Sequence, residues 1–150
     1  MAVINSRQIA RGAPIPAFGA GGGQVRTQHA LVDVPLGATT TDTMPLFYLP
    51  YGALVRAIIV KSAALGGATT LNIGDGGYGS VVADPDRYLA ANTVTTAGGV
   101  ITTMAATGVF FATGASANRL LVTAQFAAGT VATAGTLEVS IEYEYEEPQQ

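Results

Sequence analysis

The chain has 150 residues, a formal net charge of −3, and charged side chains at only 11% of its positions. Globular domains usually carry about 25% charged residues, so this composition favours a protein whose surface is covered by other chains over a soluble monomer with a threonine-rich surface. The absence of cysteine excludes disulfides and thiolate chemistry, and the acidic balance argues against general nucleic-acid binding.

Residues 1–28 are predicted to form an extended arm. Gly12, Pro14, Pro16 and the run 19–23 interrupt regular structure. The glycine run lacks the lysine and helix of a phosphate-binding loop, so we interpret it as a hinge. Isolated apolar and basic side chains in such a segment are typical of chain that orders on a partner. The candidate partner-binding residues are Arg7, Arg11, Ile15, Phe18 and Arg26.

The body, residues 29–150, is predicted to be a single antiparallel β-sandwich. Short apolar runs separated by glycine- and proline-containing turns indicate strands. The expected strands are residues 29–34, 46–49, 54–61, 69–73, 100–104, 109–112, 119–126 and 136–146. The strand at 54–61 has apolar residues at both parities, which predicts a central strand that is buried on both faces.

One short helix is predicted from Asp84 to about Ala91. Asp84 can cap the helix, Pro85 suits its first position, and Asp86 interacts favourably with the helix dipole. No run approaches the roughly 20 apolar residues of a membrane helix, and no secretory signal is present, so we expect cytoplasmic synthesis and no membrane partner.

The segment 136–146 carries the clearest strand signal. Apolar residues alternate strictly with acidic and polar ones, which predicts one face on the core and one in water. The apolar set is Leu137, Val139, Ile141, Tyr143 and Tyr145, and the outward set is Glu138, Ser140, Glu142, Glu144 and Glu146. The segment 119–126 alternates in the same way, and we expect 127–135 to join the two strands as an antiparallel hairpin.

No catalytic, cofactor-binding or metal site is predicted, so the chain is not expected to be an enzyme. His29, the single histidine, shares a strand face with Asp33, but a catalytic triad requires further contacts, and an exposed strand pair is the preferred interpretation. Asp75, Asp84 and Asp86 match no calcium-loop spacing.

Two other groups of residues invite a functional interpretation. The C-terminal glutamates alternate on an exposed strand face, where they cannot oppose each other across a cleft as glycoside hydrolysis requires. Four tyrosines could stack on sugars, although the core or a subunit interface is the better interpretation. They are Tyr78, Tyr88, Tyr143 and Tyr145. The basic N-terminal region and the acidic C-terminal region could also pair between neighbouring subunits.

Several strand-and-turn patterns resemble a known group of proteins. The sequence Asn-Arg-Leu-Leu-Val-Thr-Ala-Gln-Phe at 118–126, Gly-Thr at 129–130, and Gly-Thr-Leu-Glu-Val-Ser-Ile-Glu-Tyr at 135–143 resemble the closing hairpin of head decoration, or cement, proteins of tailed bacteriophages. Residues 54–60 and 71–75 are similar to the same group. The resemblance covers residues 46–146 and leaves the arm unmatched.

The resemblance implies a jelly-roll-like sandwich with no enzymatic activity and no cofactor. It implies a virion protein, made in the host cytoplasm, that binds the outer capsid surface and bridges neighbouring subunits of the major capsid protein. Such proteins are usually dimers or trimers. The alternative is a receptor- or glycan-binding β-sandwich module of a phage fibre or spike, because fold alone does not decide function.

Overall fold

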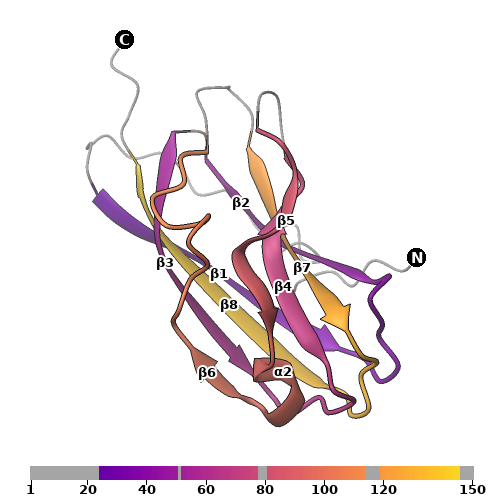
Figure 1. Cartoon of the computed structure of the whole chain (residues 1–150). Coiled ribbons are helices and arrows are strands. Elements are labelled where there is room, and N and C mark those ends of the chain that lie inside the picture. The colour runs from indigo at the N-terminus through magenta and orange to yellow at the C-terminus, as the bar shows by residue number, and fades with distance from the viewer. Residues whose placement is uncertain (1–23, 51, 78–80, 114–118, 146–150) are drawn as a thin grey trace.

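The computed structural model describes residues 24–50, 52–77, 81–113 and 119–145. Two four-stranded antiparallel sheets pack face to face, with strand orders β1-β8-β3-β6 and β2-β7-β4-β5 (Figure 1). The elements are β1 (Gln24–Val34), β2 (Thr43–Leu49), β3 (Ala53–Ser62), β4 (Thr70–Asp75), β5 (Asp84–Asn92), α2 (Val94–Ala97), β6 (Gly99–Ile101), β7 (Leu120–Ala128) and β8 (Gly135–Tyr145). No helix in these ranges is long and apolar enough to cross a membrane.

The strands pair in nested order: β1 with β8, β2 with β7, β3 with β6, and β4 with β5. This nesting is what a long antiparallel ribbon gives when it is folded over itself into two sheets, and it defines a jelly roll. The predicted all-β sandwich with jelly-roll connectivity is therefore confirmed, and the described part of the chain contains one short helix.

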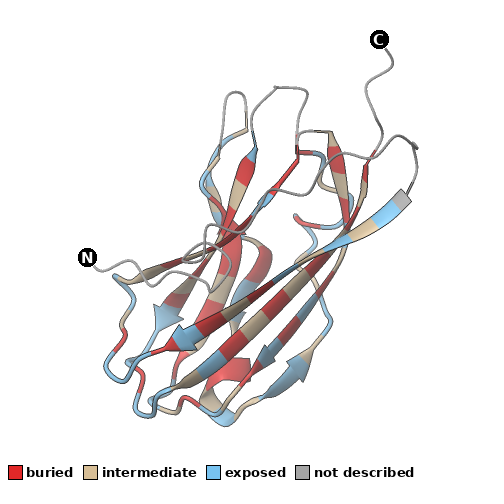
Figure 2. Ribbon diagram, turned by 180° about the vertical axis from the view of Figure 1, so that it is seen from behind, coloured by how far each residue is buried: buried red, intermediate tan, exposed pale blue. Residues whose placement is uncertain are grey.

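The alternation of β8 places its apolar side chains in the core, as predicted. Leu137, Val139 and Ile141 are fully buried, and Tyr143 and Tyr145 are no more than 3% exposed. Seen from behind, the strands of the first sheet show alternating bands of buried and more exposed residues (Figure 2). The core is thus made by the inward faces of both sheets.

The prediction that β3 is buried on both faces is wrong. Val55, Ile58 and Val60 are fully buried, whereas Ile59 is 40% exposed. The pairing of β3 with β8 shifts register at Arg56, which lies between the paired residues on either side of it. This β-bulge changes the parity of the inward residues, so apolar side chains occur at both parities although only one face is buried.

The predicted hairpin between the last two strands is also wrong, because β7 and β8 lie in different sheets. β8 pairs instead with β1 and β3. The connection crosses from one sheet to the other, and Val131 within it exchanges backbone hydrogen bonds with Gly37 and Ala38. The sequence pattern shows only that each strand has one apolar face. Two such strands can pair in one sheet, or they can pack against the core from opposite sheets, as β7 and β8 do.

The helix predicted at 84–91 is strand β5, and the one helix among the described residues is the short α2. β5 lies at the edge of the second sheet, where the missing N–H of Pro85 removes no necessary ladder bond. An ion pair between Arg87 and Asp75 of β4 ties β5 to its neighbour. Long-range contacts therefore outweigh the local helix signals at Asp84 and Asp86.

Residues 102–113 close one side of the sandwich. The predicted strand at 100–104 is the shorter β6, and the predicted strand at 109–112 is reduced to an isolated bridge between Leu54 and Ala112. Within this segment Ala105 N–H donates to Tyr88 O of β5, and Phe110 N–H donates to Val55 O of β3. The segment thus connects the exposed edges of both sheets.

Candidate interaction surfaces

The outer surface of the first sheet is charged. We call the outward side of β1, β8 and β3 the charged face. Its central row is acidic, with Glu138, Glu142 and Glu144 on β8, and the neighbouring strand β3 contributes Arg56 and Lys61. The outward residues of β1 are Val25, Thr27, His29, Leu31 and Asp33.

Ion pairs cross the charged face between strands. Arg56 Nη2 lies 2.8 Å from Glu144 Oε1, and Lys61 Nζ lies 3.8 Å from Glu138 Oε2. His29 Nε2 lies 3.7 Å from Glu138 Oε1. These pairs are exposed, so each contributes at most about 1 kcal/mol to stability, and their main effect is to set the charge pattern of this surface.

Phe110 stands at the edge of the charged face. The Arg56 guanidinium lies 5.3 Å from the centre of the Phe110 ring, and the Phe110 side chain is 59% exposed. Its φ of +56° falls in the left-handed region, which a bulky side chain seldom occupies. An exposed aromatic ring held by strained backbone is a feature typical of contact surfaces.

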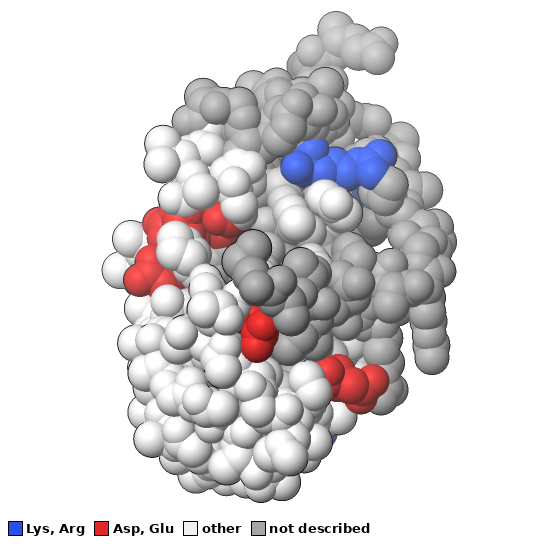
Figure 3. Space-filling view, turned by 90° about the vertical axis from the view of Figure 1, so that its right-hand side faces the viewer, with Lys and Arg blue, Asp and Glu red and all other residues white. Residues whose placement is uncertain are grey.

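The outer surface of the second sheet differs in having almost no charge. We call the outward side of β2, β7 and β4 the uncharged face. The one charged residue of these three strands is Asp75, whose side chain is buried. The outward residues are Thr43, Pro45, Tyr48, Leu121, Thr123, Gln125, Thr70 and Asn72. Figure 3 views the molecule from the side of β7, and most described atoms there are uncharged.

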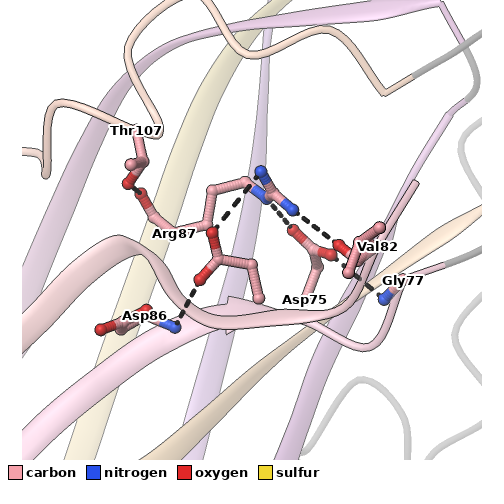
Figure 4. A network of polar contacts seen from close by, with 7 residues as sticks. Asp75, Gly77, Val82, Asp86, Arg87 and Thr107 are labelled. Atoms are coloured by element: carbon pink, nitrogen blue, oxygen red, sulfur yellow. Dashed lines mark hydrogen bonds and ion pairs between the residues drawn. The ribbon is translucent and has the colours of Figure 1, made fainter.

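Asp75 and Arg87 form a buried ion pair that joins β4, β5 and the loop between them (Figure 4). Arg87 Nε donates to Asp75 Oδ2 at 2.6 Å, and Gly77 N–H donates to Asp75 Oδ1 at 3.1 Å. Arg87 Nη2 donates to Val82 O at 2.8 Å. Arg87 Nη1 also lies 3.6 Å from Asp84 Oδ2. The carboxylate and the guanidinium thus hold the two ends of the loop.

Aromatic rings pack between β5 and the segment 102–113, with Tyr88 on the strand and Phe111 on the segment. The Arg87 guanidinium lies 3.9 Å from the centre of the Phe111 ring, and Phe111 meets the Tyr88 ring edge to face at 6.2 Å. The Tyr88 hydroxyl is buried and has no hydrogen-bond partner among the described residues. Burial raises the pKa of Tyr88, and the negative charge of Asp75 raises this pKa further. Tyr88 therefore stays neutral.

The ion pair of Arg87 with Asp75 and the rings packed beside it hold β4 and β5 together, which is a structural role. A hydrogen bond with Asp84 raises the pKa of Asp86, and burial and the Asp84 charge act in the same direction. Within the described part of the chain, no three His, Cys, Asp or Glu residues are grouped so that they could hold a metal ion. Of the three aspartates considered as calcium ligands, Asp75 and Asp84 instead pair with Arg87, and the Asp86 N–H donates to Asp84 Oδ1. The Arg87–Asp75 pair has no sequence signal, since its members lie 12 positions apart and two other acidic residues, Asp84 and Asp86, lie nearer to Arg87 in the sequence.

The structure describes only one of the five predicted partner-binding residues. Arg7, Arg11, Ile15 and Phe18 lie outside the described residues. Arg26 lies in β1 opposite Tyr143 of β8. Burial raises the pKa of Tyr143, while a hydrogen bond from Gln28 and the Arg26 charge lower it.

The other candidate residues have structural positions. His29 and Asp33 lie on the same outward face of β1, as predicted, and His29 Nδ1 lies 3.0 Å from Ser140 Oγ of β8. Tyr88, Tyr143 and Tyr145 are core residues, which confirms the interpretation against a sugar platform. Tyr78 and the glycine run 19–23 lie outside the described residues.

Neither a protein-family model nor a curated protein matches the chain. Two solved structures do. A chain of the Cyanophage Pam1 capsid asymmetric unit is 26% identical, with 89% of this chain and 94% of that chain covered and a TM-score of 0.67. A chain of the capsid of Ralstonia phage GP4 is 24% identical, with 97% and 99% covered and a TM-score of 0.77, which shows a shared fold. The matches support a phage capsid-related protein.

Proposed function

We propose that this chain is a capsid decoration, or cement, protein of a tailed bacteriophage. It binds the outer surface of the shell and stabilises it by bridging neighbouring subunits of the major capsid protein. The observation that carries the proposal is the similarity to a chain of the Pam1 capsid asymmetric unit, which extends over 89% of this chain and 94% of that one. A match of this extent takes in nearly all of both sequences rather than a local motif.

The uncharged face supports the same proposal. Interface cores are depleted in charged residues relative to the rest of a protein surface, and β2, β7 and β4 offer threonine, asparagine, glutamine and tyrosine without an exposed charge. Tyr48, which is 40% exposed, is the type of residue that often anchors an interface. We assign this face to the contact with the shell.

The N-terminal arm supplies a second attachment. Ile15 and Phe18 act as apolar anchors on a neighbouring capsid subunit, and Arg7 and Arg11 pair with acidic groups there. When one attachment has formed, it holds the second close to its site and so raises the effective concentration of the second. The affinity of the two linked attachments can therefore exceed the affinity of either one alone by about 10²–10⁴-fold. This bivalent binding explains how a small protein can hold two shell subunits together.

The proposal is tested on capsids of the phage that carries the gene. Full-length protein is expected to bind expanded shells and to appear on their outer surface in cryo-electron microscopy. Deletion of residues 2–23, which leaves β1 whole, is expected to keep the fold and to reduce binding about 100-fold. The matched control is Ile15→Ala with Phe18→Ala in the full-length chain, which removes only the anchors.

Three outcomes contradict parts of this proposal. Unchanged binding of the truncated chain removes the arm from the mechanism. Density on the tail or a fibre, together with binding to a glycan array, supports the receptor-binding alternative. Failure of the full-length chain to bind any capsid surface, while its circular dichroism spectrum shows a folded β protein, removes the decoration function altogether.

A further inference from the structure

We propose that the exposed Phe110 ring, with the Arg56–Glu144 ion pair beside it, binds a neutral sugar residue of a polysaccharide. The site lies at the edge of the charged face, on the opposite side of the sandwich from the uncharged face, and it goes beyond attachment to the shell. Sugar binding is a property of the isolated chain. Only the exposure of the site on the particle rests on the proposed function, in which the uncharged face contacts the shell.

The backbone at Phe110 is unfavourable for an aromatic residue. Its φ of +56° lies in the left-handed region, where bulky side chains are rare. The other described non-glycine residues with a positive φ are Ala68 and Ala91, which are both small. Glycine or asparagine would suit this conformation better. An aromatic residue at such a position therefore points to a function of its side chain rather than of its backbone.

Phe110 and Phe111 are adjacent in the chain but differ in their surroundings. Phe111 packs against the core and meets the Tyr88 ring edge to face, so it helps to fix the segment 102–113. Phe110 is 59% exposed, so its ring adds little to the core. The fold thus accounts for an aromatic side chain at position 111 and gives no structural reason for one at position 110.

The backbone that carries the Phe110 ring is held firmly against β3. Phe110 N–H donates to Val55 O at 3.0 Å, and Val55 N–H donates to Phe111 O at 2.9 Å. Leu54 and Ala112 form an isolated bridge next to these bonds. A ring on an ordered backbone loses little conformational freedom when a ligand packs on it, and this preorganisation favours binding.

Arg56 and Glu144 supply the polar groups that a sugar requires. The Arg56 guanidinium lies 5.3 Å from the centre of the Phe110 ring, and Arg56 Nη2 donates to Glu144 Oε1 at 2.8 Å. A guanidinium has several N–H donors and a carboxylate has several acceptor positions, so this one bond uses only part of each. Neighbouring sugar hydroxyls both donate and accept hydrogen bonds, and the C–H groups on one face of a sugar ring pack on an aromatic ring. The three side chains together match these features.

The charges around the Phe110 ring favour a neutral ligand. Arg56 is already paired with Glu144, and the β3–β8 register places Arg56 between the partners of Glu142 and Glu144. Two carboxylates therefore accompany one guanidinium, and a sialic or uronic acid would add a like charge, which disfavours binding. The same charges argue against the core of a protein–protein interface, because such cores are depleted in charged residues.

A platform of this kind is expected to bind weakly. Tight ligand sites are concave and bury most of the ligand, whereas here one ring and one ion pair lie on the outer side of a sheet. We expect a Kd of about 1 mM for a single sugar residue. Many copies of the chain on one particle would raise the avidity for a polysaccharide far above the affinity of one site.

Titration of the isotope-labelled full-length chain, followed by two-dimensional NMR, tests the site. The neutral probes are the methyl glycosides of glucose, galactose and mannose, and N-acetylglucosamine. The anionic probes are glucuronic acid and N-acetylneuraminic acid. Each is added to about 50 mM, roughly fifty times the expected Kd. At least one neutral probe is expected to shift the amide signals of Arg56 and residues 110–112, and the anionic probes should bind at least about tenfold more weakly.

Substitutions at position 110 assign the binding to the ring. Phe110→Asn removes the ring and suits the left-handed backbone. We expect it to lower the affinity for the neutral sugar at least about tenfold, while the melting temperature stays the same or rises because the strain is relieved. Phe110→Tyr keeps an aromatic ring and should keep the binding. The matched control is Val100→Asn, which removes an equally exposed apolar side chain from β6 and should bind the sugar as the parent chain does.

Several results would overturn this proposal. They are the absence of a shift with every probe, tighter binding of the anionic probes, and sugar-induced shifts that persist in Phe110→Asn. A marked fall in the melting temperature of Phe110→Asn would show that the ring supports the fold instead. Loss of capsid binding in Phe110→Asn, without any response of the parent chain to sugars, would assign the ring to a protein contact. Because the titration uses the isolated chain, its outcome is separate from whether the chain binds capsids.

Discussion

Arg87 Nε lies 2.6 Å from Asp75 Oδ2, and the Asp75 side chain has no exposed surface. A buried pair of this kind contributes little net stability when intact, but removal of one partner leaves an uncompensated charge in the interior. We expect Asp75→Ala to lower the free energy of unfolding by about 3–5 kcal/mol, as measured by urea denaturation. The exposed pair offers a control: Glu144→Ala removes the partner of Arg56 and should cost at most about 1 kcal/mol.

Because the buried Tyr88 hydroxyl makes no hydrogen bond with a described residue, its removal is expected to have an unusual effect on stability. Removal of a hydroxyl that makes no hydrogen bond eliminates a desolvation cost without breaking an interaction. Tyr88→Phe is therefore expected to leave the free energy of unfolding unchanged or to raise it by about 1–2 kcal/mol. A loss of more than about 1 kcal/mol in chemical denaturation would instead identify a hydrogen-bond partner, such as a buried water that bridges Tyr88 to Asp75.

Asp86 predicts a pH dependence with a definite sign. A hydrogen bond with Asp84, burial and the Asp84 charge raise the pKa of Asp86 in the folded chain. The folded protein therefore holds this proton more tightly than the unfolded one, and the penalty for the charged form is present above the raised pKa and absent below the unfolded pKa.

Asp86→Asn removes that penalty. Because Asp86 is exposed, solvent screening limits the gain in the free energy of unfolding to a few tenths of a kcal/mol at neutral pH. The gain should disappear at acidic pH, where Asp86 is protonated in both states. Urea titrations of both proteins at the two pH values measure the difference. A gain that is equal at both pH values is inconsistent with this mechanism.

The alternation of β8 predicts opposite outcomes at adjacent positions. Ile141 is fully buried, so Ile141→Asp places a charge in the core and is expected to abolish soluble folding. Glu142 is outward, and Glu142→Lys should keep the soluble fold while it changes the charged face. Expression yield and far-UV circular dichroism compare the two. Equal tolerance of both substitutions would refute the assignment of faces.

The parts of the fold that the sequence predicts are those encoded within one strand. The inward set of β8 follows from residues two positions apart, and a single sequence displays such spacing directly. The parts that it does not predict depend on distant residues. Asp84 and Pro85 signal a helix locally, yet the pairing of Arg87 with Asp75 holds the segment as an edge strand. The bulge at Arg56 likewise shifts the buried residues of β3 from one parity to the other, so the sequence suggests two apolar faces where only one is buried.

The same distinction holds for the candidate surfaces. The outward position of the β8 glutamates was predictable, whereas the row of cations beside them depends on the β3–β8 register, in which Lys61 meets Glu138. The hairpin prediction failed for a related reason. The alternation of inward and outward residues is the same in two strands that pair within one sheet and in two strands that lie in opposite sheets. Only the pairing of β8 with β1 shows that β7 and β8 are of the second kind.

Gly67 tests the crossing connection that replaces the expected hairpin. Gly67, between β3 and β4, has a φ of +65°, and a Cβ there would overlap the Thr130 carbonyl oxygen in the connection between β7 and β8. Gly37 has a φ of +82°, and nothing lies within 4 Å of a Cβ built on it. Both glycines therefore have a positive φ that a residue with a Cβ rarely adopts, but only Gly67 lies so close to another backbone segment that a Cβ would overlap it.

Alanine at the two positions separates these effects. Gly37→Ala is expected to cost about 1–2 kcal/mol, the energy of a left-handed conformation for a residue with a Cβ. Gly67→Ala should cost about 1–3 kcal/mol more, because the Thr130 backbone must move to relieve the overlap. Thermal and urea unfolding measure both variants. Equal losses would show that the two connections do not approach each other, and this would reopen the assignment of β7 and β8 to different sheets.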